Sequence, residues 1–140
     1  MDITITYAED RDWDYLVKND DHVRPEVLRR LIDNGQVIVL RDGDQTIGWL
    51  RFDFFWDMIP FMSMFAIEEE YRCQGLGTQV AHFWEAEMKK QGYEMLLTST
   101  QVNERAQHLY RRLGYKDCGG LVLPLYDEPM ELFLVKTLKE

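Results

Sequence analysis

Runs of apolar residues, some continuous and some alternating with polar ones, predict a set of β-strands along the chain. Residues 3–7 alternate apolar side chains with threonine, which is typical of a strand with one buried face. Residues 61–67 are apolar at nearly every position, which favours a central strand buried on both faces. Asp42-Gly43-Asp44 is a hairpin signal. The other expected strands cover residues 36–41, 46–55, 95–100, 115–125 and 130–138, the last two joined by residues 126–129.

Apolar residues spaced three and four positions apart predict two helices in the first part of the chain. Asp10 can cap the first helix, which covers residues 11–18. Pro25 suits the first turn of the second helix, which ends at Asn34-Gly35. The side chains of the first helix that are expected to face the core are Trp13, Leu16 and Val17.

Two further helices follow the expected central strand. The longer one covers residues 75–91. The shorter one begins at Asn103, a good N-cap residue, and ends at Gly114, which suits the left-handed position after a helix. Their expected buried faces are Leu76, Val80, Phe83, Trp84 and Met88 in the longer helix, and Ala106, Leu109, Tyr110 and Leu113 in the shorter one.

The order of these elements, β-α-α-β-β-β-α-β-α-β-β, predicts one α/β domain over residues 1–140. Its mixed sheet has about seven strands, with helices on both faces. A chain of 140 residues with 46% hydrophobic content can form the core of a single domain. The apolar stretches are too short to span a bilayer and no basic-then-apolar leader opens the chain, so we expect a cytoplasmic protein with no membrane partner. A monomer and a homodimer both fit the sequence.

The net charge of −9 is unevenly distributed along the chain. Residues 1–70 contain 16 acids and 7 bases, whereas residues 71–140 contain 9 of each. Acidic surface repels the backbone of nucleic acids, so we expect no nucleic-acid partner. The excess negative charge either attracts a cationic ligand or only serves solubility, and the sequence leaves both interpretations open.

The segment between the central strand and the longer helix predicts a phosphate-binding turn. Gly75 and Gly77 let the backbone approach a ligand closely, and the helix start presents unpaired N–H groups. Arg72 can add charge-assisted hydrogen bonds. A dinucleotide fingerprint would need glycine in place of Val80, and a P-loop would need Gly-Lys-Ser/Thr at residues 80–82. A phosphorylated cofactor is therefore expected on another kind of fold, with ordinary turn chemistry as the alternative.

A second motif lies about thirty residues further on. Residues 103–115 read Asn-x-x-Ala-x-x-Leu-Tyr-x-x-x-Gly-Tyr, after Arg-x-x-Gly-x-Gly at residues 72–77. With both motifs in this order, the chain resembles the GNAT superfamily of N-acetyltransferases over nearly its whole length. The resemblance implies the GNAT fold and direct transfer of the acetyl group of acetyl-CoA to a primary amine in a ternary complex. The implied acceptor is a small cationic metabolite or drug, or a protein lysine or N-terminus.

The resemblance also implies roles for individual residues. Tyr110 is the candidate general acid for the coenzyme sulfur, with a core aromatic as the alternative. Asn103 is expected to contact the pantetheine arm, and the backbone of residues 65–67 is expected to bond to that arm. The diphosphate is expected on the amide groups of residues 75–78. The full set of implied coenzyme-binding residues is Phe65, Ala66, Ile67, Arg72, Cys73, Gln74, Gly75, Leu76, Gly77, Thr78, Asn103 and Tyr110.

The general base and the acceptor site are left with several candidates. Some relatives carry a carboxylate near the start of the fourth strand, where this chain has none. The candidate bases are therefore Asp53, Asp57 and Glu68, each with an ordinary surface acid as the alternative. The candidate acceptor residues are Asp20, Asp21 and His22 between the first two helices, and Asp53, Trp56 and Asp57 in the aromatic segment before the fourth strand. For that aromatic segment, the alternatives are core packing and a dimer contact.

Other function classes have less support in the sequence. His22, His82 and His108 show no metal-ligand spacing, so we expect no metal. Cys73 and Cys118 do not indicate a disulfide scaffold. A CoA-binding sensor without catalysis is the first alternative, because the fourth-strand carboxylate is missing. A nucleotide-binding regulatory domain is the second.

Overall fold

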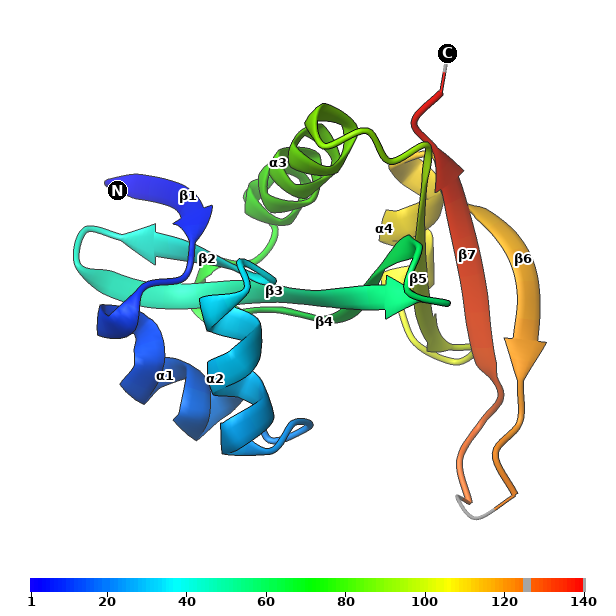
Figure 1. The fold of residues 1–140 in the computed structure, drawn as a ribbon, viewed down its shortest axis with the longest axis horizontal. Helices are drawn as coiled ribbons and strands as arrows, with labels where there is room; N and C mark the ends of the chain where they lie inside the picture. Colours follow the sequence, from blue (N-terminus) through cyan, green and yellow to red (C-terminus); the bar gives the residue numbers. More distant parts are fainter. Residues whose placement is uncertain (125–126, 140) are drawn as a thin grey trace. The chain divides into compact units, whose positions relative to one another are not determined.

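The computed structural model describes residues 1–124 and 127–139 (Figure 1). Hydrogen bonds join seven strands in the order β1-β2-β3-β4-β5-β7-β6, so β4 is central, as its apolar sequence predicts. β4 and β5 are parallel, whereas β1–β2, β2–β3, β5–β7 and β6–β7 are antiparallel. This mixed sheet with helices confirms the expected fold class. The elements are β1 (Ile3–Tyr7), η1 (Asp10–Asp12), α1 (Trp13–Asn19), α2 (Pro25–Asp33), β2 (Val37–Asp42), β3 (Gln45–Phe55), β4 (Ile59–Ile67), η2 (Glu69–Tyr71), α3 (Leu76–Lys90), β5 (Met95–Gln101), α4 (Ala106–Arg112), β6 (Lys116–Leu121) and β7 (Glu131–Thr137).

The chain divides into two compact units. The first contains Met1–Phe52 and Met64–Trp84, and the second contains Asp53–Ser63 and the chain from Glu85 onward. Three elements contribute to both units, because β3 changes unit after Phe52, β4 after Ser63 and α3 after Trp84.

In the first unit, helices cover both faces of the strands (Figure 1). Successive residues of a strand point to opposite faces, and β2 is buried on both. Val39 belongs to the cluster that β2 and β3 form with α1 and α2. On the other side lies the first part of α3, where Tyr7 of β1 contacts Phe83 at 5.9 Å and Phe52 of β3 contacts Trp84 at 5.7 Å. The members of the cluster with α1 and α2 are Leu16, Leu28, Leu31, Ile32, Val37, Val39 and Trp49.

Asp12 forms a buried ion pair that ties the first helical segment to the strands. Its carboxylate accepts hydrogen bonds from Arg41 at 2.9 and 2.6 Å and from the Thr46 hydroxyl at 2.7 Å. Burial acts to raise the pKa of Asp12, but the hydrogen bonds from Arg41, the Glu9 amide and Thr46 outweigh it and hold this pKa below its usual value. The pair therefore stabilises the fold in its charged form.

In the second unit, β7 lies between β5 and β6, and α4 covers β5 (Figure 1). The β5–β7 ladder runs from Met95↔Thr137 to Gln101↔Glu131. β6 ends at Leu121, four residues before the predicted end at position 125. Leu125 and Tyr126, which were assigned to that strand and its turn, lie outside the described residues.

Two predictions about helix α4 have different outcomes. The N-cap prediction for Asn103 is wrong, because α4 begins at Ala106 and Arg105 holds the N-cap position. The residues before it form a turn instead, in which the Glu104 carboxylate accepts the Gln101 amide at 2.9 Å. The prediction for Gly114 is confirmed, since its φ is +99° and it follows the end of the helix.

The first helix also differs from its prediction. α1 begins at Trp13 rather than at residue 11, because residues 10–12 form a 3₁₀ turn from which Asp12 points into the core. Val17 was expected to face inward but is 36% exposed. Within the described part of the chain, none of the helices combines the length and apolar character needed to cross a membrane.

Candidate functional site

The turn between η2 and α3, in the first unit, has the open backbone that a bound phosphate requires. Cys73 has a φ of +62° and Gly75 a φ of +80°, so the chain curls tightly before the helix. The first backbone hydrogen bond at the helix start runs from the Gln79 amide to the Gly75 oxygen at 3.2 Å. The amide groups of residues 76–78 precede it and have no acceptor one turn back within the helix. Residues 72–75 are exposed and residues 77 and 78 are half-buried, so an anion can approach this turn from solvent.

Side chains of the same turn hold it to the preceding segment. The Arg72 Nε donates to the Ile67 oxygen at 2.8 Å, at the end of β4. The Gln74 amide donates to the Glu70 oxygen at 3.2 Å. Arg72 therefore orients the turn through one nitrogen, and its remaining guanidinium N–H groups are exposed to solvent. Cys73 lies in the turn as a free, exposed cysteine.

The end of β4, where Phe65, Ala66 and Ile67 were expected to meet the pantetheine arm, is half-buried. On one edge it is approached closely by β3, since a Cβ atom at Gly48 would lie 2.9 Å from the Ala66 oxygen. The parallel ladder with β5 contains Phe61↔Leu97 and Met62↔Thr98, near the start of β4. Among the described pairs, the ladder therefore ends well before the last residues of β4.

Tyr110 lies where this ladder ends, within the second unit. Its side chain is 5% exposed and makes a hydrogen bond with the side chain of Thr98. The Thr98 hydroxyl also donates to the Met62 oxygen at 3.2 Å, so the same residue joins β4, β5 and α4. Burial is the main reason that the pKa of Tyr110 rises to about 12; the Thr98 hydrogen bond opposes the rise, and the charges of Glu104 and Glu131 add to it. The phenol is therefore protonated at neutral pH, as a proton donor must be.

A buried polar group supports the end of α4. The Tyr115 hydroxyl donates to Glu85 at 2.9 Å, and the Lys136 ammonium donates to the same carboxylate at 2.9 Å. The ring of Tyr115 lies 6.0 Å from that of Tyr110. Burial, followed by the charge of Glu85, raises the pKa of Tyr115. These contacts of Glu85 were not predicted from the sequence, although a glutamate next to Trp84 on the buried side of a helix was a possible signal.

Asn103 and the loop between α1 and α2 are only partly placed as expected. Asn103 is exposed in the turn before α4, and the N-cap position belongs to Arg105 instead. Asp20 is buried, and its carboxylate accepts from Trp49 at 3.2 Å and from Arg51 at 2.7 Å. These contacts give Asp20 a structural role in the first unit and leave its charge already paired. Asp21 is exposed and pairs with His22 at 2.9 Å.

The other acceptor and base candidates lie at surface positions. Asp53, Trp56 and Asp57 are exposed in the second unit, Trp56 to 75%. Trp56 and Asp57 both have a φ of +57°, so they form the turn between β3 and β4. In the first unit, Glu68 accepts a hydrogen bond from the Tyr15 hydroxyl at 2.7 Å. Across residues 1–124 and 127–139, no group of three His, Cys, Asp or Glu side chains is placed to hold a metal ion.

The two carboxylates whose charges raise the pKa of Tyr110, Glu104 and Glu131, were not among the predicted residues. Glu131, at the start of β7, accepts a hydrogen bond from the Ser99 hydroxyl at 2.6 Å. Glu104 accepts from Thr100 at 3.3 Å as well as from the Gln101 amide. Both glutamates are thus held by the carboxyl end of β5. No pattern in the sequence indicates that these glutamates lie here, because only the pairing of β5 with β7 brings Glu131 to this position.

Comparison with known proteins agrees with this arrangement. A family model described as "Acetyltransferase (GNAT) family" matches residues 4–115. The chain is similar to a chain of the NatC complex bound to Gag peptide and CoA, with 16% identity, 99% of this chain and 100% of that chain covered, and a TM-score of 0.85. The chain is also similar to yncA, a putative acetyltransferase from Salmonella typhimurium with its cofactor acetyl-CoA. The identity is 15%, 100% of this chain and 96% of that chain are covered, and the TM-score is 0.82.

A third similar structure is the ribosomal-protein-S18-alanine N-acetyltransferase from Escherichia coli, with 16% identity, 99% of this chain and 95% of that chain covered, and a TM-score of 0.79. At these identities, the three structures show a shared fold. None of the proteins of curated function matches the chain.

Proposed function

The chain belongs to the acetyltransferase (GNAT) family, and we propose that it transfers the acetyl group of acetyl-CoA to a primary amine by direct attack in a ternary complex. The observation that carries the proposal is the Tyr110 hydroxyl, which is neutral, buried and held by Thr98 where the β4–β5 ladder ends. The family assignment makes the protein an acetyltransferase, and the proposal adds the roles of its residues and the class of its acceptor.

The diphosphate of the coenzyme binds to the turn before α3. The amides of residues 76–78, which have no acceptor within the helix, offer hydrogen bonds at the positive end of the helix dipole, and Arg72 offers its remaining N–H groups. The half-buried backbone of residues 65–67 accompanies the pantetheine arm. Asn103, which is exposed before α4, makes a second contact to that arm in this proposal. When bound, acetyl-CoA supplies the activated acetyl group as a thioester.

Tyr110 gives its proton to the sulfur as the bond between sulfur and the acetyl carbon breaks. The attacking amine forms the new bond to that carbon and loses one proton to water. No side chain of the protein needs to act as a nucleophile. With a pKa of about 12, Tyr110 is a weak acid that stays protonated until the thiolate forms beside it.

The acceptor is a small cationic amine or the amine of a protein. The excess of acids in residues 1–70 favours a cation. Two of the similar structures are named for a bound peptide and for an alanine of a ribosomal protein, which favours a protein amine. A monomer and a homodimer are both compatible with this chemistry, and a cytoplasmic location would supply acetyl-CoA.

A direct assay tests the proposal. The protein is incubated with acetyl-CoA and a panel of amines that includes an alkylamine, a polyamine and a peptide with a free N-terminus, and released CoA thiol is measured. The expected result is amine-dependent thiol release. Binding of CoA without transfer to any of these amines would favour the sensor alternative, and a thermal shift assay without any CoA binding would refute both.

A further inference from the structure

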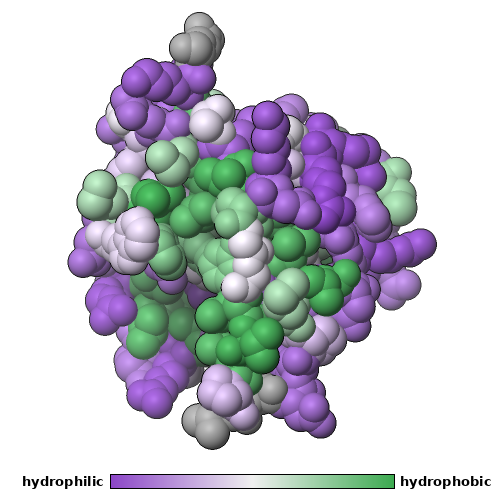
Figure 2. Space-filling model, turned by 90° about the vertical axis from the view of Figure 1, so that its right-hand side faces the viewer, coloured by the Kyte–Doolittle hydropathy of each residue, from purple (hydrophilic) through white to green (hydrophobic). Residues whose placement is uncertain are grey.

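The second unit has apolar side chains on its surface and a charged group in its interior. The hairpin of β6 and β7 exposes Leu121 to 43% and Val122 to 68%. Figure 2 views the side of the molecule on which β6 and β7 lie, and apolar side chains gather on it. In the interior, Glu85 of α3 is only 7% exposed, and the proposed reaction does not use its carboxylate. A buried carboxylate is costly, so its role in the fold or in function requires an explanation.

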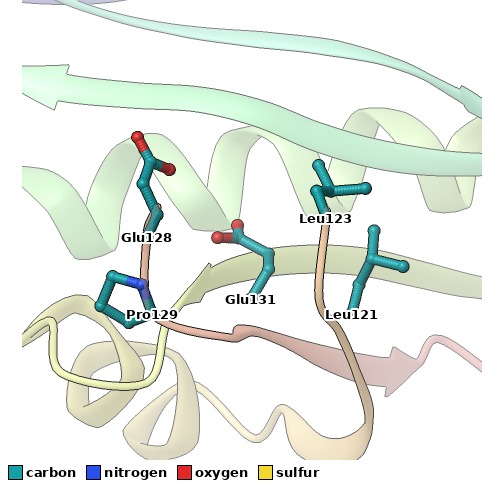
Figure 3. Close-up of a pocket in the computed structure, with 5 residues that line it drawn as sticks. All are labelled: Leu121, Leu123, Glu128, Pro129 and Glu131. Atoms are coloured by element: carbon teal, nitrogen blue, oxygen red, sulfur yellow. The ribbon is translucent and has the colours of Figure 1, made fainter. Parts of the chain in front are cut away.

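Glu85 differs from the two glutamates whose charges raise the pKa of Tyr110. Glu104 is exposed. Glu131 is half-buried and lines a cavity of about 240 Å³ in the hairpin, and Figure 3 shows its side chain among those that line this cavity. Solvent therefore reaches both of these glutamates, whereas Glu85 depends on protein partners.

Both carboxylate oxygens of Glu85 accept hydrogen bonds from buried or half-buried donors. The Tyr115 hydroxyl donates to one oxygen at 2.9 Å, and the Lys136 ammonium donates to the other at 2.9 Å. The same ammonium lies 5.7 Å from the centre of the Tyr115 ring. The charges of Glu85 and Lys136 cancel, so these three residues, the Glu85 cluster, form a neutral group that fixes the Tyr115 hydroxyl.

Tyr115 is joined to Tyr110 through both its backbone and its ring. The Tyr115 amide donates to the Tyr110 oxygen at 2.9 Å, and the two ring centres lie 6.0 Å apart. Gly114 bends the chain between them with a φ of +99°, and a Cβ atom there would lie 3.5 Å from Cε of Lys136. Lys136 thus packs over this bend. Tyr115 holds the backbone and ring of Tyr110, while Thr98 bonds to its side chain.

Helix α4 is too short to hold Tyr110 by itself. It has seven residues, and an isolated helix of this length is not stable in water without tertiary contacts. A proton donor must stay within hydrogen-bond distance of the leaving sulfur, and a displacement of about 1 Å can cost roughly 100-fold in rate. The position of the Tyr110 hydroxyl therefore depends on what holds the end of this helix.

We propose that the Glu85 cluster positions Tyr110 for acetyl transfer. Glu85 fixes the Tyr115 hydroxyl, and Tyr115 then fixes the ring and the backbone of Tyr110. The proposal rests on the acid role of Tyr110 proposed above, and it makes Glu85, Tyr115 and Lys136 positioning residues that take no part in the chemistry itself. A cluster with a merely structural role would stabilise the fold without any specific effect on Tyr110.

The first test measures the order of Tyr110 without any turnover. In protein that is free of coenzyme and carries carbon-13 in its tyrosine rings, NMR relaxation measures how fast each ring flips. The ring signal that disappears in Tyr110→Phe belongs to Tyr110. Tyr115→Phe keeps the neighbouring ring and removes its bond to Glu85, so the Tyr110 ring should flip about tenfold faster. An unchanged flip rate would overturn the proposal.

The second test separates turnover from coenzyme binding. The rate is measured with acetyl-CoA and the amine of the panel above that releases thiol fastest. Tyr115→Phe and Glu85→Met should each lower kcat roughly tenfold, because Tyr110 spends less time where it can protonate the sulfur. The dissociation constant of acetyl-CoA should stay within about twofold of the wild type. Glu85→Gln keeps an acceptor for the Tyr115 hydroxyl, so its kcat should lie between those of the wild type and Glu85→Met.

The matched control is Glu87→Met on the same helix. Glu87 pairs with the exposed Lys90 at 3.0 Å rather than with the Glu85 cluster. This variant should keep both the kcat of the wild type and the flip rate of the Tyr110 ring. Unfolding in urea is followed for every variant, and kcat is compared under conditions in which all of them are folded.

A double-mutant cycle shows whether the cluster acts through Tyr110. In the Tyr110→Phe background the proton donor is already absent, so adding Tyr115→Phe should lower kcat no further. A tenfold loss in both backgrounds would mean a general effect on the fold and would overturn the proposal. Transfer by the wild type with an unchanged kcat in Tyr115→Phe overturns the positioning role and leaves the function in place. Faster flipping of the Tyr110 ring in a protein that acetylates none of the amines supports the cluster and overturns the reaction.

Discussion

At the scale of single residues, the proposed chemistry depends on one hydroxyl in a buried position. Replacing Tyr110 with Phe keeps the ring that packs beside Tyr115 and removes the group bonded to Thr98. We expect kcat to fall roughly 100-fold, because the leaving sulfur loses its proton donor in the transition state. The dissociation constant of acetyl-CoA should stay within about twofold of the wild type. Steady-state kinetics and calorimetry measure the two quantities.

The matched control for this change is Tyr93→Phe, which removes a hydroxyl from another tyrosine of the second unit that packs against Phe54. It should leave kcat unchanged. If Tyr110→Phe instead weakened acetyl-CoA binding as much as it lowered kcat, Tyr110 would have a binding or packing role rather than an acidic one.

Another residue-scale prediction concerns the stability contributed by Asp12. Because hydrogen bonds hold the folded pKa of Asp12 below its ordinary value of 3.8, the charged carboxylate stabilises the fold. That contribution is complete above the unfolded pKa and is lost as the pH falls through the folded one. Asp12→Asn should lower the free energy of unfolding by roughly 3 kcal/mol at pH 7, since Arg41 is left buried without its partner. Urea unfolding at pH 7 and at lower pH measures the difference.

The difference between wild type and Asp12→Asn should shrink once the pH is below about 4, where the wild-type carboxylate becomes protonated as well. Asp14→Asn removes an exposed acid two residues further on, in α1, and should show neither effect. A constant difference at all pH values would mean that Asp12 contributes through packing alone.

At the scale of elements, the turn before α3 can be tested with two glycines of the first unit. Gly75 has a φ of +80° and Gly35 a φ of +72°, and a Cβ atom at either would meet nothing within 4 Å. Alanine at each position should therefore cost a similar 1–2 kcal/mol of stability, roughly, for a left-handed backbone. Only Gly75→Ala should also weaken CoA binding, because the strain acts on the proposed diphosphate turn. Thermal melts and CoA titrations of both variants separate the two effects.

If the two variants lost CoA affinity equally, the loss would reflect general destabilisation. The turn would then have no special part in binding. If neither lost affinity, the backbone at position 75 would be free to relax around the ligand.

The elements that the sequence predicted well are those with local signals. The apolar run of β4, the proline at the start of α2 and Gly114 after α4 each act within a few residues, and the structure confirms them. Asn103 failed as an N-cap because Glu104 and Gln107 bond within the preceding turn, where the Gln107 amide donates to the Val102 oxygen at 2.8 Å. Propensity favours a cap at Asn103, but these local side-chain contacts decide against it.

Distant pairings explain what the sequence could not provide. Asp20 is neutralised by Arg51, 31 positions later, and Glu85 meets Lys136, 51 positions later. Glu131 reaches Ser99 only through the β5–β7 ladder. The sequence alone does not distinguish one acidic side chain from another. The residues that each acid contacts in the folded protein decide whether it has a structural role, as Asp20 does, or is free to bind an ammonium group.

At the scale of the whole molecule, the net charge of −9 affects the two substrates in opposite ways. It attracts a cationic amine and repels the phosphates of acetyl-CoA, and salt screens both effects over a Debye length of about 10 Å at 0.1 M. Raising NaCl from about 20 to 200 mM should therefore raise the KM for a cationic alkylamine acceptor and lower the KM for acetyl-CoA. Both constants are measured in one series of initial rates at constant pH.

The opposite signs make this a test of what the charge does, because a general effect of salt on stability would move both constants in the same direction. An amine KM that stays constant with salt in the wild type would leave solubility as the role of the charge.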